Sequence, residues 1–358
     1  MNISEFAETI EFNIVHNIKH SILGLGAPGI GKSELIQQIG QKYGYKVIDL
    51  RLAQMSEVEI SGLIFPNEDK TKTIWLSPDI LPDEKRDGNK TILLLDEITS
   101  CSKKVQVAAY QLILDRRIGQ YKLPEGTFVI ALGNREDDDG VYIHLAGPLA
   151  DRFEIHYIEP DFETWKYTYA LNNGVHPLVI SYLTFKPAAL HTHDPESDAM
   201  TFATPRSWVR VSDILHFDDD ITKNVVRNKI AGNIGEIEAR QFFEFCKKKE
   251  KYVTLDQVLA GRKQLPVEMD EVSVFISSIA SRLNFLANVE SEEELTDEQK
   301  RIVGSTIEII FDFKNSEYTV MGLRELIGLN RRVAKQIFLN TDNSNIFQFI
   351  NSNEYLYN

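Results

Sequence analysis

The chain has 358 residues, 43% of them hydrophobic and 26% charged, which is typical of a globular protein with more than one domain. Its formal net charge of −14 argues against nucleic acid as a partner, because an acidic surface repels phosphate backbones. No apolar run is long enough to span a membrane, and the N-terminal sequence lacks the features of a secretory signal. Cys101 and Cys246 match no metal-binding spacing. We therefore expect a cytoplasmic protein without a membrane partner and with reduced cysteines.

The first half of the chain alternates short apolar runs with amphipathic stretches, the pattern of a parallel sheet flanked by helices. Strands are predicted at residues 22–25, 46–50, 92–95, 128–132 and 154–158. Three of these runs are nearly all apolar, as central strands buried on both faces should be. Helices are predicted between the strands at residues 33–43 and 103–115.

After Pro160 the strand pattern ends. Helical periodicity predicts helices at residues 162–171, 176–183, 207–215, 221–230 and 237–248. The remainder is predicted to be mainly helical, with the acidic run 290–294 as a solvated loop or helix start. The predicted fold is an α/β core over residues 1–160, a helical lid over 161–250, and a mainly helical C-terminal extension of unassigned role over 251–358.

The sequence GAPGIGKS at residues 26–33 fits the phosphate-loop pattern GxxxxGK[ST] at every position. Glycines allow backbone N–H groups to close around phosphate oxygens at the start of a helix, whose dipole favours anions. Lys32 can reach the β- and γ-phosphates, and the Ser33 hydroxyl can bind Mg²⁺. The candidate nucleotide-binding residues are Gly26, Ala27, Pro28, Gly29, Ile30, Gly31, Lys32 and Ser33.

The apolar run at 92–95 ends in two carboxylates, Asp96 and Glu97. Alone, this ending usually marks only a strand that has reached solvent. After a phosphate loop it predicts that Asp96 helps to hold Mg²⁺, directly or through water, and that Glu97 acts as general base on the attacking water.

Three further polar residues follow in an order that suits the same site. Asn134 comes directly after the strand at 128–132 and could touch both the γ-phosphate and the attacking water. Arg152 precedes the last strand and could reach the nucleotide of a neighbouring subunit, although a surface salt bridge is an alternative. Arg206 follows Pro205 near a predicted helix start and could sense the γ-phosphate, with Arg210 as a rival.

The segments GAPGIGKS, LLLDE, the GN strand end, LADRF and TPRSW, taken in this order, resemble the AAA+ family of P-loop NTPases. Within it the chain is similar to the MoxR-like branch of bacteria and phages, over roughly residues 22–248. The resemblance implies Walker A roles for Lys32 and Ser33, Walker B roles for Asp96 and Glu97, and a sensor 1 role for Asn134. It further implies Arg152 as the finger acting in a neighbouring subunit, with Arg116 and Arg117 as rivals, and Arg206 as sensor 2.

The resemblance also implies ATP and Mg²⁺ as cofactors, an ATPase reaction and assembly into a homo-oligomeric ring, typically a hexamer. Such rings act as chaperones that remodel or mature a partner protein, often one with a von Willebrand factor A domain. The region of residues 55–65 would be an insertion that contacts the partner. Two alternatives remain open, a nucleotide-gated scaffold with little turnover and a DNA-associated motor, and the acidic charge argues against the second.

Overall fold

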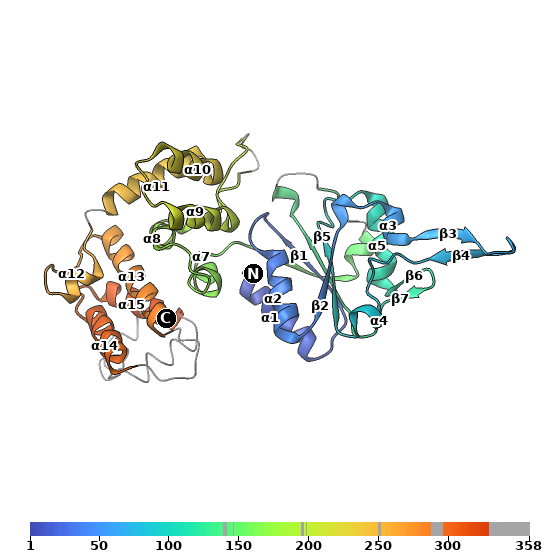
Figure 1. Ribbon diagram of the computed structural model, residues 1–358, viewed down its shortest axis with the longest axis horizontal. Coiled ribbons are helices and arrows are strands. Elements are labelled where there is room, and N and C mark those ends of the chain that lie inside the picture. The colour runs from blue at the N-terminus through green and yellow to red at the C-terminus, as the bar shows by residue number, and fades with distance from the viewer. Residues whose placement is uncertain are drawn as a thin grey trace. The chain divides into compact units, whose positions relative to one another are not determined.

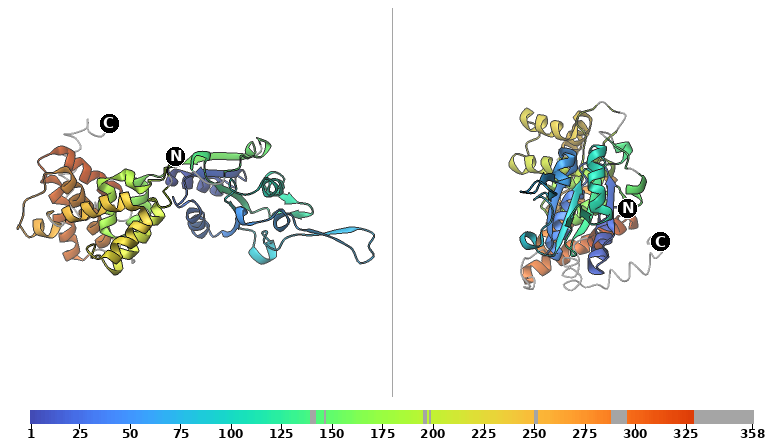
Figure 2. Two further views of the ribbon diagram at one scale, coloured as in Figure 1. Left: turned by 90° about the horizontal axis from the view of Figure 1, so that it is seen from above. Right: turned by 90° about the vertical axis from the view of Figure 1, so that its right-hand side faces the viewer.

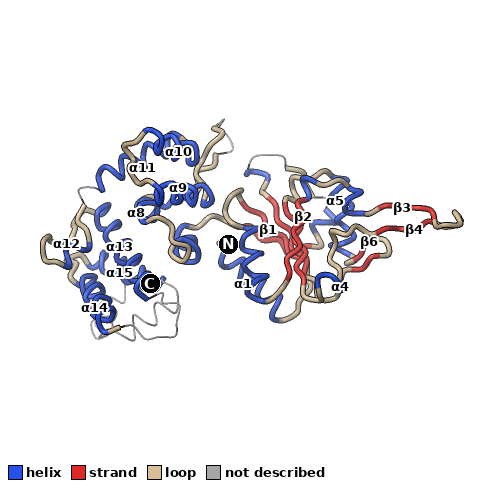
Figure 3. The backbone as a smooth tube through the Cα atoms, in the orientation of Figure 1, coloured by secondary structure: helices blue, strands red, loops and turns tan. Residues whose placement is uncertain are grey.

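The computed structural model describes residues 1–138, 142–145, 147–194, 197, 199–249, 252–287 and 296–328. The acidic run 290–294 and residues 329–358 of the predicted extension lie outside the described residues. The chain divides into two compact units, Met1–Asp161 with His193–Asp198, and Phe162–Thr192 with Ala199–Asn358. In the described part, all strands belong to the first unit (Figure 3). Every helix described there is too short or too polar to cross a lipid bilayer.

The first unit is built on a parallel five-stranded sheet in the order β2–β5–β8–β1–β9 (Figure 1). Its strands are β1 (Ser21–Gly26), β2 (Lys46–Arg51), β5 (Thr91–Asp96), β8 (Phe128–Gly133) and β9 (Phe153–Ile158). Each of them contains one predicted run, so the predicted parallel sheet is confirmed. The three apolar runs form β5, β8 and β1 in the middle of the sheet, where β1 and β8 are buried along their whole length.

Helices cover both faces of this sheet, with α1 (Ile3–Val15) and α2 (Lys32–Tyr43) on one side and α5 (Lys103–Leu114) on the other (Figure 1). Because side chains alternate along a strand, Ile22 joins the core beneath α1 and α2, whereas Leu23 joins the core beneath α5. Helix α1 was not predicted. Its start carries a capping box in which Asn2 and Glu5 satisfy each other's backbone N–H groups, a signal that the sequence contained.

A hairpin of β3 (Leu63–Pro66) and β4 (Thr73–Leu76) extends away from the sheet (Figure 2). It follows the short helix α3 (Glu57–Ser61), so residues 55–65, where an insertion is predicted, hold α3 and most of β3, and the hairpin continues to Leu76. The hairpin is unusual in its exposed apolar side chains, which are Leu63, Ile64, Phe65, Ile74 and Leu76. The other short elements described in this unit are α4 (Glu84–Asp87), β6 (Arg117–Ile118), β7 (Tyr121–Lys122), α6 (Gly147–Ala150) and the 3-10 turns η1 (Leu52–Gln54) and η2 (Glu136–Asp138).

The second unit is helical in its described part and has two apolar cores. The first core centres on Tyr182, Trp208 and Phe242, and the second on Phe275 and Ile310. Its helices are α7 (Phe162–Trp165), α8 (Pro177–Phe185), α9 (Pro205–Phe217), α10 (Asn224–Ile234), α11 (Glu236–Lys249), α12 (Leu255–Leu259), α13 (Met269–Ala287), α14 (Asp297–Phe311) and α15 (Ser316–Gly328). The helix predicted at 162–171 continues after α7 as a π-helical turn, η3 (Lys166–Ala170).

Candidate nucleotide site

Three predicted site segments follow neighbouring strands at the carboxyl edge of the sheet. The phosphate loop follows β1, Asp96 ends β5 and Asn134 follows β8, and β8 lies between the other two strands. Ligands of open α/β sheets bind at this edge, where the order of the strands reverses. The fold thus brings together residues that are far apart in the sequence.

Backbone geometry shapes the phosphate loop. A Cβ atom on Gly26 would lie 2.5 Å from the carbonyl oxygen of Ile158, which cannot move aside because it belongs to β9. Gly29 and Gly31 have φ angles of 79° and 96°, in the left-handed region that favours glycine. Gly31 directly precedes α2, so the unpaired N–H groups of the first helical turn face the loop. The loop therefore has the form of an anion cradle.

The side chain of Lys32 lies along this cradle and is only 8% exposed. Its ammonium donates hydrogen bonds to the carbonyl oxygens of Gly26 and Ala27, the second at 2.8 Å. It also lies 3.4 Å from Oδ1 of Asn134. A fixed positive charge is thereby held between the phosphate loop and the end of β8.

Ser33 and Asp96 meet beside Lys32. The Ser33 hydroxyl donates to Oδ2 of Asp96 at 2.7 Å, and Oδ1 of Asp96 accepts the backbone N–H of Glu97 at 2.9 Å. A hydroxyl and a carboxylate oxygen in contact are hard oxygen ligands of the kind that Mg²⁺ prefers. The residues present therefore fit a magnesium-bound nucleoside triphosphate.

Another carboxylate, that of Asp49 on β2, lies near Asp96 and was not singled out from the sequence. Burial, and then the negative charge of Asp96, raise the pKa of the Asp49 carboxyl above its usual value. A cation bound at Asp96 would offset this repulsion.

Glu97 has a strained backbone, with a φ of 59° in the region that non-glycine residues rarely adopt. Such strain costs on the order of 1–3 kcal/mol and is concentrated at functional sites. The Glu97 side chain is exposed, and no hydrogen bond or ion pair joins its carboxylate to the residues that the structure describes. The carboxylate is therefore available to accept a proton from water.

Asn134 is held by a residue that the sequence did not reveal. The buried Thr99 hydroxyl accepts the backbone N–H of Asn134 at 3.0 Å and lies 3.2 Å from its carbonyl oxygen, to which it can donate. A Cβ atom on Gly133 would lie 2.7 Å from this hydroxyl, so glycine is required for the close approach. Thr99 thus fixes where the Asn134 amide points, although nothing in its local sequence marks it.

The three arginines considered as fingers differ in their surroundings. Arg152 lies between α6 and β9, is exposed, and forms no ion pair with any described residue. Arg116 is partly buried and donates to the Thr127 carbonyl inside its own subunit, and burial lowers its pKa. Arg117 is exposed and lies 3.8 Å from Asp115. Of the three, Arg152 is the one whose side chain has neither an ion-pair partner nor a hydrogen-bond partner within the described part of the chain.

Arg206 and Arg210 belong to the second unit. They lie one turn apart on α9, whose first residue is Pro205, and both are exposed. The predicted start of this helix near Arg206 is therefore correct. The contact of either guanidinium with a γ-phosphate stays a prediction.

A family model matches the part of the chain that holds this site. Residues 21–153 match the family model described as an AAA domain of the dynein-related subfamily. The P-loop AAA fold predicted from the sequence is therefore confirmed for this part of the chain. The comparison with curated proteins finds no match.

Solved structures with a similar arrangement include a putative ATPase from Cytophaga hutchinsonii, at 14% identity and a TM-score of 0.34, covering 75% of this chain and 92% of that one. One mutant of RuvB from Thermotoga maritima is similar at 17% identity and a TM-score of 0.38, covering 84% of this chain and 92% of that one. Another mutant of the same RuvB has 17% identity and a TM-score of 0.35, with the same coverage.

Proposed function

We propose that this protein is a Mg²⁺-dependent ATPase of the MoxR type that assembles into a homo-oligomeric ring, typically a hexamer, and remodels or matures a partner protein. The observation that carries the proposal is the meeting of Lys32, Ser33, Asp96 and Asn134 at one sheet edge, beside the unengaged carboxylate of Glu97. An exposed Arg152 without an ion-pair partner among the described residues supports a role in a neighbouring subunit.

Each residue would contribute a separate part of the hydrolysis of ATP. The loop N–H groups and Lys32 would bind the phosphates, while Ser33 and Asp96 would hold Mg²⁺, which neutralises negative charge on the phosphate oxygens. Glu97 would take a proton from the attacking water, and Asn134 would orient that water. Arg152 of the adjacent subunit would complete the charge stabilisation, which couples turnover to assembly.

The test of the enzymatic part is the Glu97→Gln variant. Glutamine keeps the size and shape of glutamate but cannot act as a base, so we expect ATP affinity within a few-fold of the parent. Turnover should fall by about 10²-fold or more, in line with the loss of general base catalysis. ATP binding is measured by calorimetry with Mg²⁺ present, and hydrolysis by release of phosphate.

The matched control is Glu125→Gln, which removes an exposed carboxylate from the loop before β8, at the amino edge of the sheet. It should retain full turnover. Hydrolysis by Glu97→Gln at the parental rate would show that another group is the base. A parent protein that binds ATP but does not turn over would instead favour the scaffold alternative.

Thr99→Val tests whether the orientation of Asn134 matters for turnover. Valine keeps the shape of threonine but removes the hydroxyl that holds both backbone groups of Asn134. We expect kcat to fall by about tenfold or more, while the KM for ATP changes little, because positioning acts on the transition state. A KM change with an unaltered kcat would contradict this role.

The β3–β4 hairpin is the part of the first unit that best suits contact with a partner protein. It presents five exposed apolar side chains on one two-stranded ribbon. Single exposed apolar residues are common on protein surfaces, but a cluster of them often marks a site of contact with another protein. We expect Ile64→Asp, at a side chain that is 70% exposed, to keep basal ATP turnover within about twofold, because exposed positions tolerate polar residues.

Partner retention is measured by capture on the Glu97→Gln protein with ATP, with and without Ile64→Asp. The proposal expects proteins retained by Glu97→Gln to be lost from the double variant. Val107→Asp is the control, since Val107 is 68% exposed on α5 and lies outside the hairpin. Equal retention by all three proteins would exclude the hairpin as a contact surface.

A further inference from the structure

An arginine beside the phosphate loop joins two carboxylates from different parts of the first unit. Arg135 directly follows Asn134, and its Nη2 donates to Oδ1 of Asp138 at 2.8 Å, while its Nε donates to the same carboxylate. Its Nη1 donates to the carboxylate of Glu159, the residue that follows β9. In the sheet, β1 lies between β8 and β9. The Arg135 side chain therefore reaches past the end of β1, where the phosphate loop begins.

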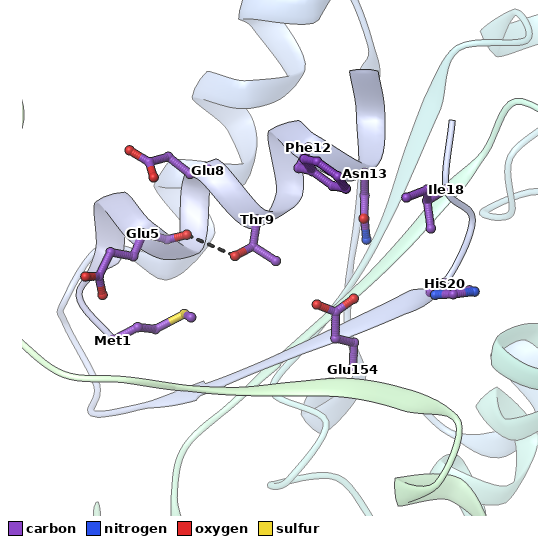
Figure 4. Close-up of a pocket in the computed structure, with 9 residues that line it drawn as sticks. All are labelled: Met1, Glu5, Glu8, Thr9, Phe12, Asn13, Ile18, His20 and Glu154. Carbon is purple, nitrogen blue, oxygen red and sulfur yellow. Dashed lines mark hydrogen bonds between the residues drawn. The ribbon is translucent and has the colours of Figure 1, made fainter. Parts of the chain in front are cut away.

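Glu159 lies at the edge of the sheet that holds the phosphate loop. It comes directly after Ile158, which pairs with Gly26, the first residue of that loop. Glu154, near the start of β9, has different surroundings, because it lines a pocket beside α1 to which Glu159 does not contribute (Figure 4). The contact of Arg135 with Glu159 thus belongs to the nucleotide edge and not to this pocket.

Asp138 is the buried partner of the arginine, with an exposed fraction of 4%. Its Oδ2 also accepts the backbone N–H of Arg135 at 2.7 Å. Burial acts to raise the pKa of the Asp138 carboxyl, but the hydrogen bonds from Arg135, and then the charges of Arg135 and Lys32, bring this pKa below its usual value. A carboxylate is therefore held close to both the phosphate-loop lysine and the residue that follows Asn134.

Asn134 depends on these contacts for its position. Thr99 accepts the backbone N–H of Asn134, and Asp138 accepts that of the next residue, Arg135. Oδ1 of Asn134 lies 3.4 Å from the Lys32 ammonium, so a shift of this segment would move the amide relative to the phosphate loop. A misplacement of about 1 Å in an active site can lower a rate by about 10²-fold. The contacts of Arg135 therefore bear on catalysis as well as on folding.

We propose that Arg135 is a positioning residue for ATP hydrolysis, which holds the Asn134 amide in place by bridging Asp138 and Glu159 past the start of the phosphate loop. This inference rests on the proposed ATPase function and adds to it a dependence on Glu159, which lies close to Phe162, where the second unit begins. Arginine suits the task, because its planar fork can serve two carboxylates in fixed directions, whereas the ammonium of lysine is a single point charge.

Arg135→Lys is the main variant, since it keeps the positive charge and removes the fork. We expect kcat to fall by about tenfold or more while the KM for ATP changes by less than about twofold, because positioning acts on the transition state. Glu159→Gln should lower kcat by only about threefold, since the Glu159 side chain is 58% exposed and Arg135 keeps its contact with Asp138. Turnover is measured by phosphate release with Mg²⁺ present, well below the Tm of each protein.

Arg86→Lys is the matched control. Arg86 likewise bridges a buried and an exposed carboxylate, those of Asp87 and Asp79, at 2.7 and 2.9 Å. Asp87 also accepts from Lys46 at the start of β2, which places this bridge at the amino edge of the sheet, away from the candidate site. Both lysine variants should lower the Tm by similar amounts, and only Arg135→Lys should lower kcat. Parental kcat in both variants would overturn the proposal.

Hydrogen exchange followed by mass spectrometry tests the same role without nucleotide. The backbone N–H groups of Asn134 and Arg135 are bonded to the side chains of Thr99 and Asp138, so a loosened segment should exchange them faster. We expect exchange in a peptide that covers these groups to rise by at least about fivefold in Arg135→Lys and to stay parental in the Arg86→Lys control. Faster exchange with parental kcat would show a purely structural role and would overturn the proposal.

The two readouts keep this inference apart from the proposed ATPase function. Parental turnover in Arg135→Lys would contradict the positioning role and leave the ATPase function standing. A parent protein that does not hydrolyse ATP would contradict the ATPase function. Hydrogen exchange would then still decide whether Arg135 holds Asn134, since parental exchange in Arg135→Lys would overturn that role as well.

Discussion

Arg152→Ala is expected to lower ATP turnover by about 10³-fold or more while leaving ATP affinity and the stability of the subunit nearly unchanged. Arginine fingers acting on a transferred phosphoryl group typically contribute 10³–10⁵-fold to kcat. Arg152 is exposed and forms no ion pair with the described residues, so its truncation removes no contact that stabilises its own subunit. The loss should therefore appear in kcat alone, measured by phosphate release at saturating ATP.

A mixing experiment separates action across a subunit boundary from action within one chain. Arg152→Ala and Glu97→Gln are each expected to be nearly inactive. In mixed rings, an Arg152→Ala subunit keeps its own Glu97 and can receive Arg152 from a Glu97→Gln neighbour. Turnover should therefore reappear on mixing, and should rise with total protein concentration as rings assemble.

Arg117→Ala is the matched control, since Arg117 is an exposed arginine of the same unit that lies near Asp115. It should keep parental turnover. Arg116 is a poorer control, because its guanidinium is engaged with the Thr127 carbonyl. Inactivity of every mixture, with each single variant still able to assemble, would show that Arg152 acts within its own subunit or not at all.

The parts of the fold that could be predicted from sequence are those governed by local pattern. A central parallel strand must be apolar on both faces, so the strands β1, β5 and β8 can be recognised in the sequence as continuous apolar runs. The phosphate loop is equally explicit, because Gly29 and Gly31 need φ angles that other residues avoid. The order of these motifs then predicted that Lys32, Asp96 and Asn134 meet, and the structure brings them together.

Other features depend on contacts between distant residues and leave little local trace. Thr99 matters because it lies against Gly133 and Asn134 on the neighbouring strand, a proximity that only the order of the strands creates. Neither strand of the hairpin around Ile64 was predicted, since exposed apolar residues obscure the usual alternation of inward and outward side chains. Asp49 was missed because its raised pKa comes from burial and from the charge of Asp96 on the neighbouring strand β5, and neither can be seen in the local sequence.

A second large effect is expected on the stability of the second unit, where two buried side chains form an ion pair. Lys166 on η3 is fully buried, and its ammonium donates to the carboxylate of Glu325 on α15, which is 5% exposed. Burial, and then the negative charge of Glu325, raise the pKa of the neighbouring Tyr167. The pair links the segment that follows the sheet to the last described helix.

Lys166→Met and Glu325→Leu are each expected to lower the free energy of unfolding of this unit by about 3–5 kcal/mol, because either change leaves the opposite charge buried and unpaired. The double variant should recover most of the loss, since replacing both charges by apolar groups also removes their desolvation cost. The change in unfolding free energy of the double variant should therefore be much smaller than the sum of the changes of the two single variants. Loss of packing at two independent sites would instead give additive changes.

Urea unfolding followed by tryptophan fluorescence measures these differences in a Trp75→Phe background, which leaves Trp165 and Trp208 as reporters of the second unit. Lys247→Met is the control, because Lys247 pairs with Glu244 on the surface of α11 and should leave the midpoint unchanged. A double variant that is as unstable as the sum of the two single variants would contradict the argument. The Lys166–Glu325 contact would then stabilise the unit through the packing of the two side chains and not through their charges.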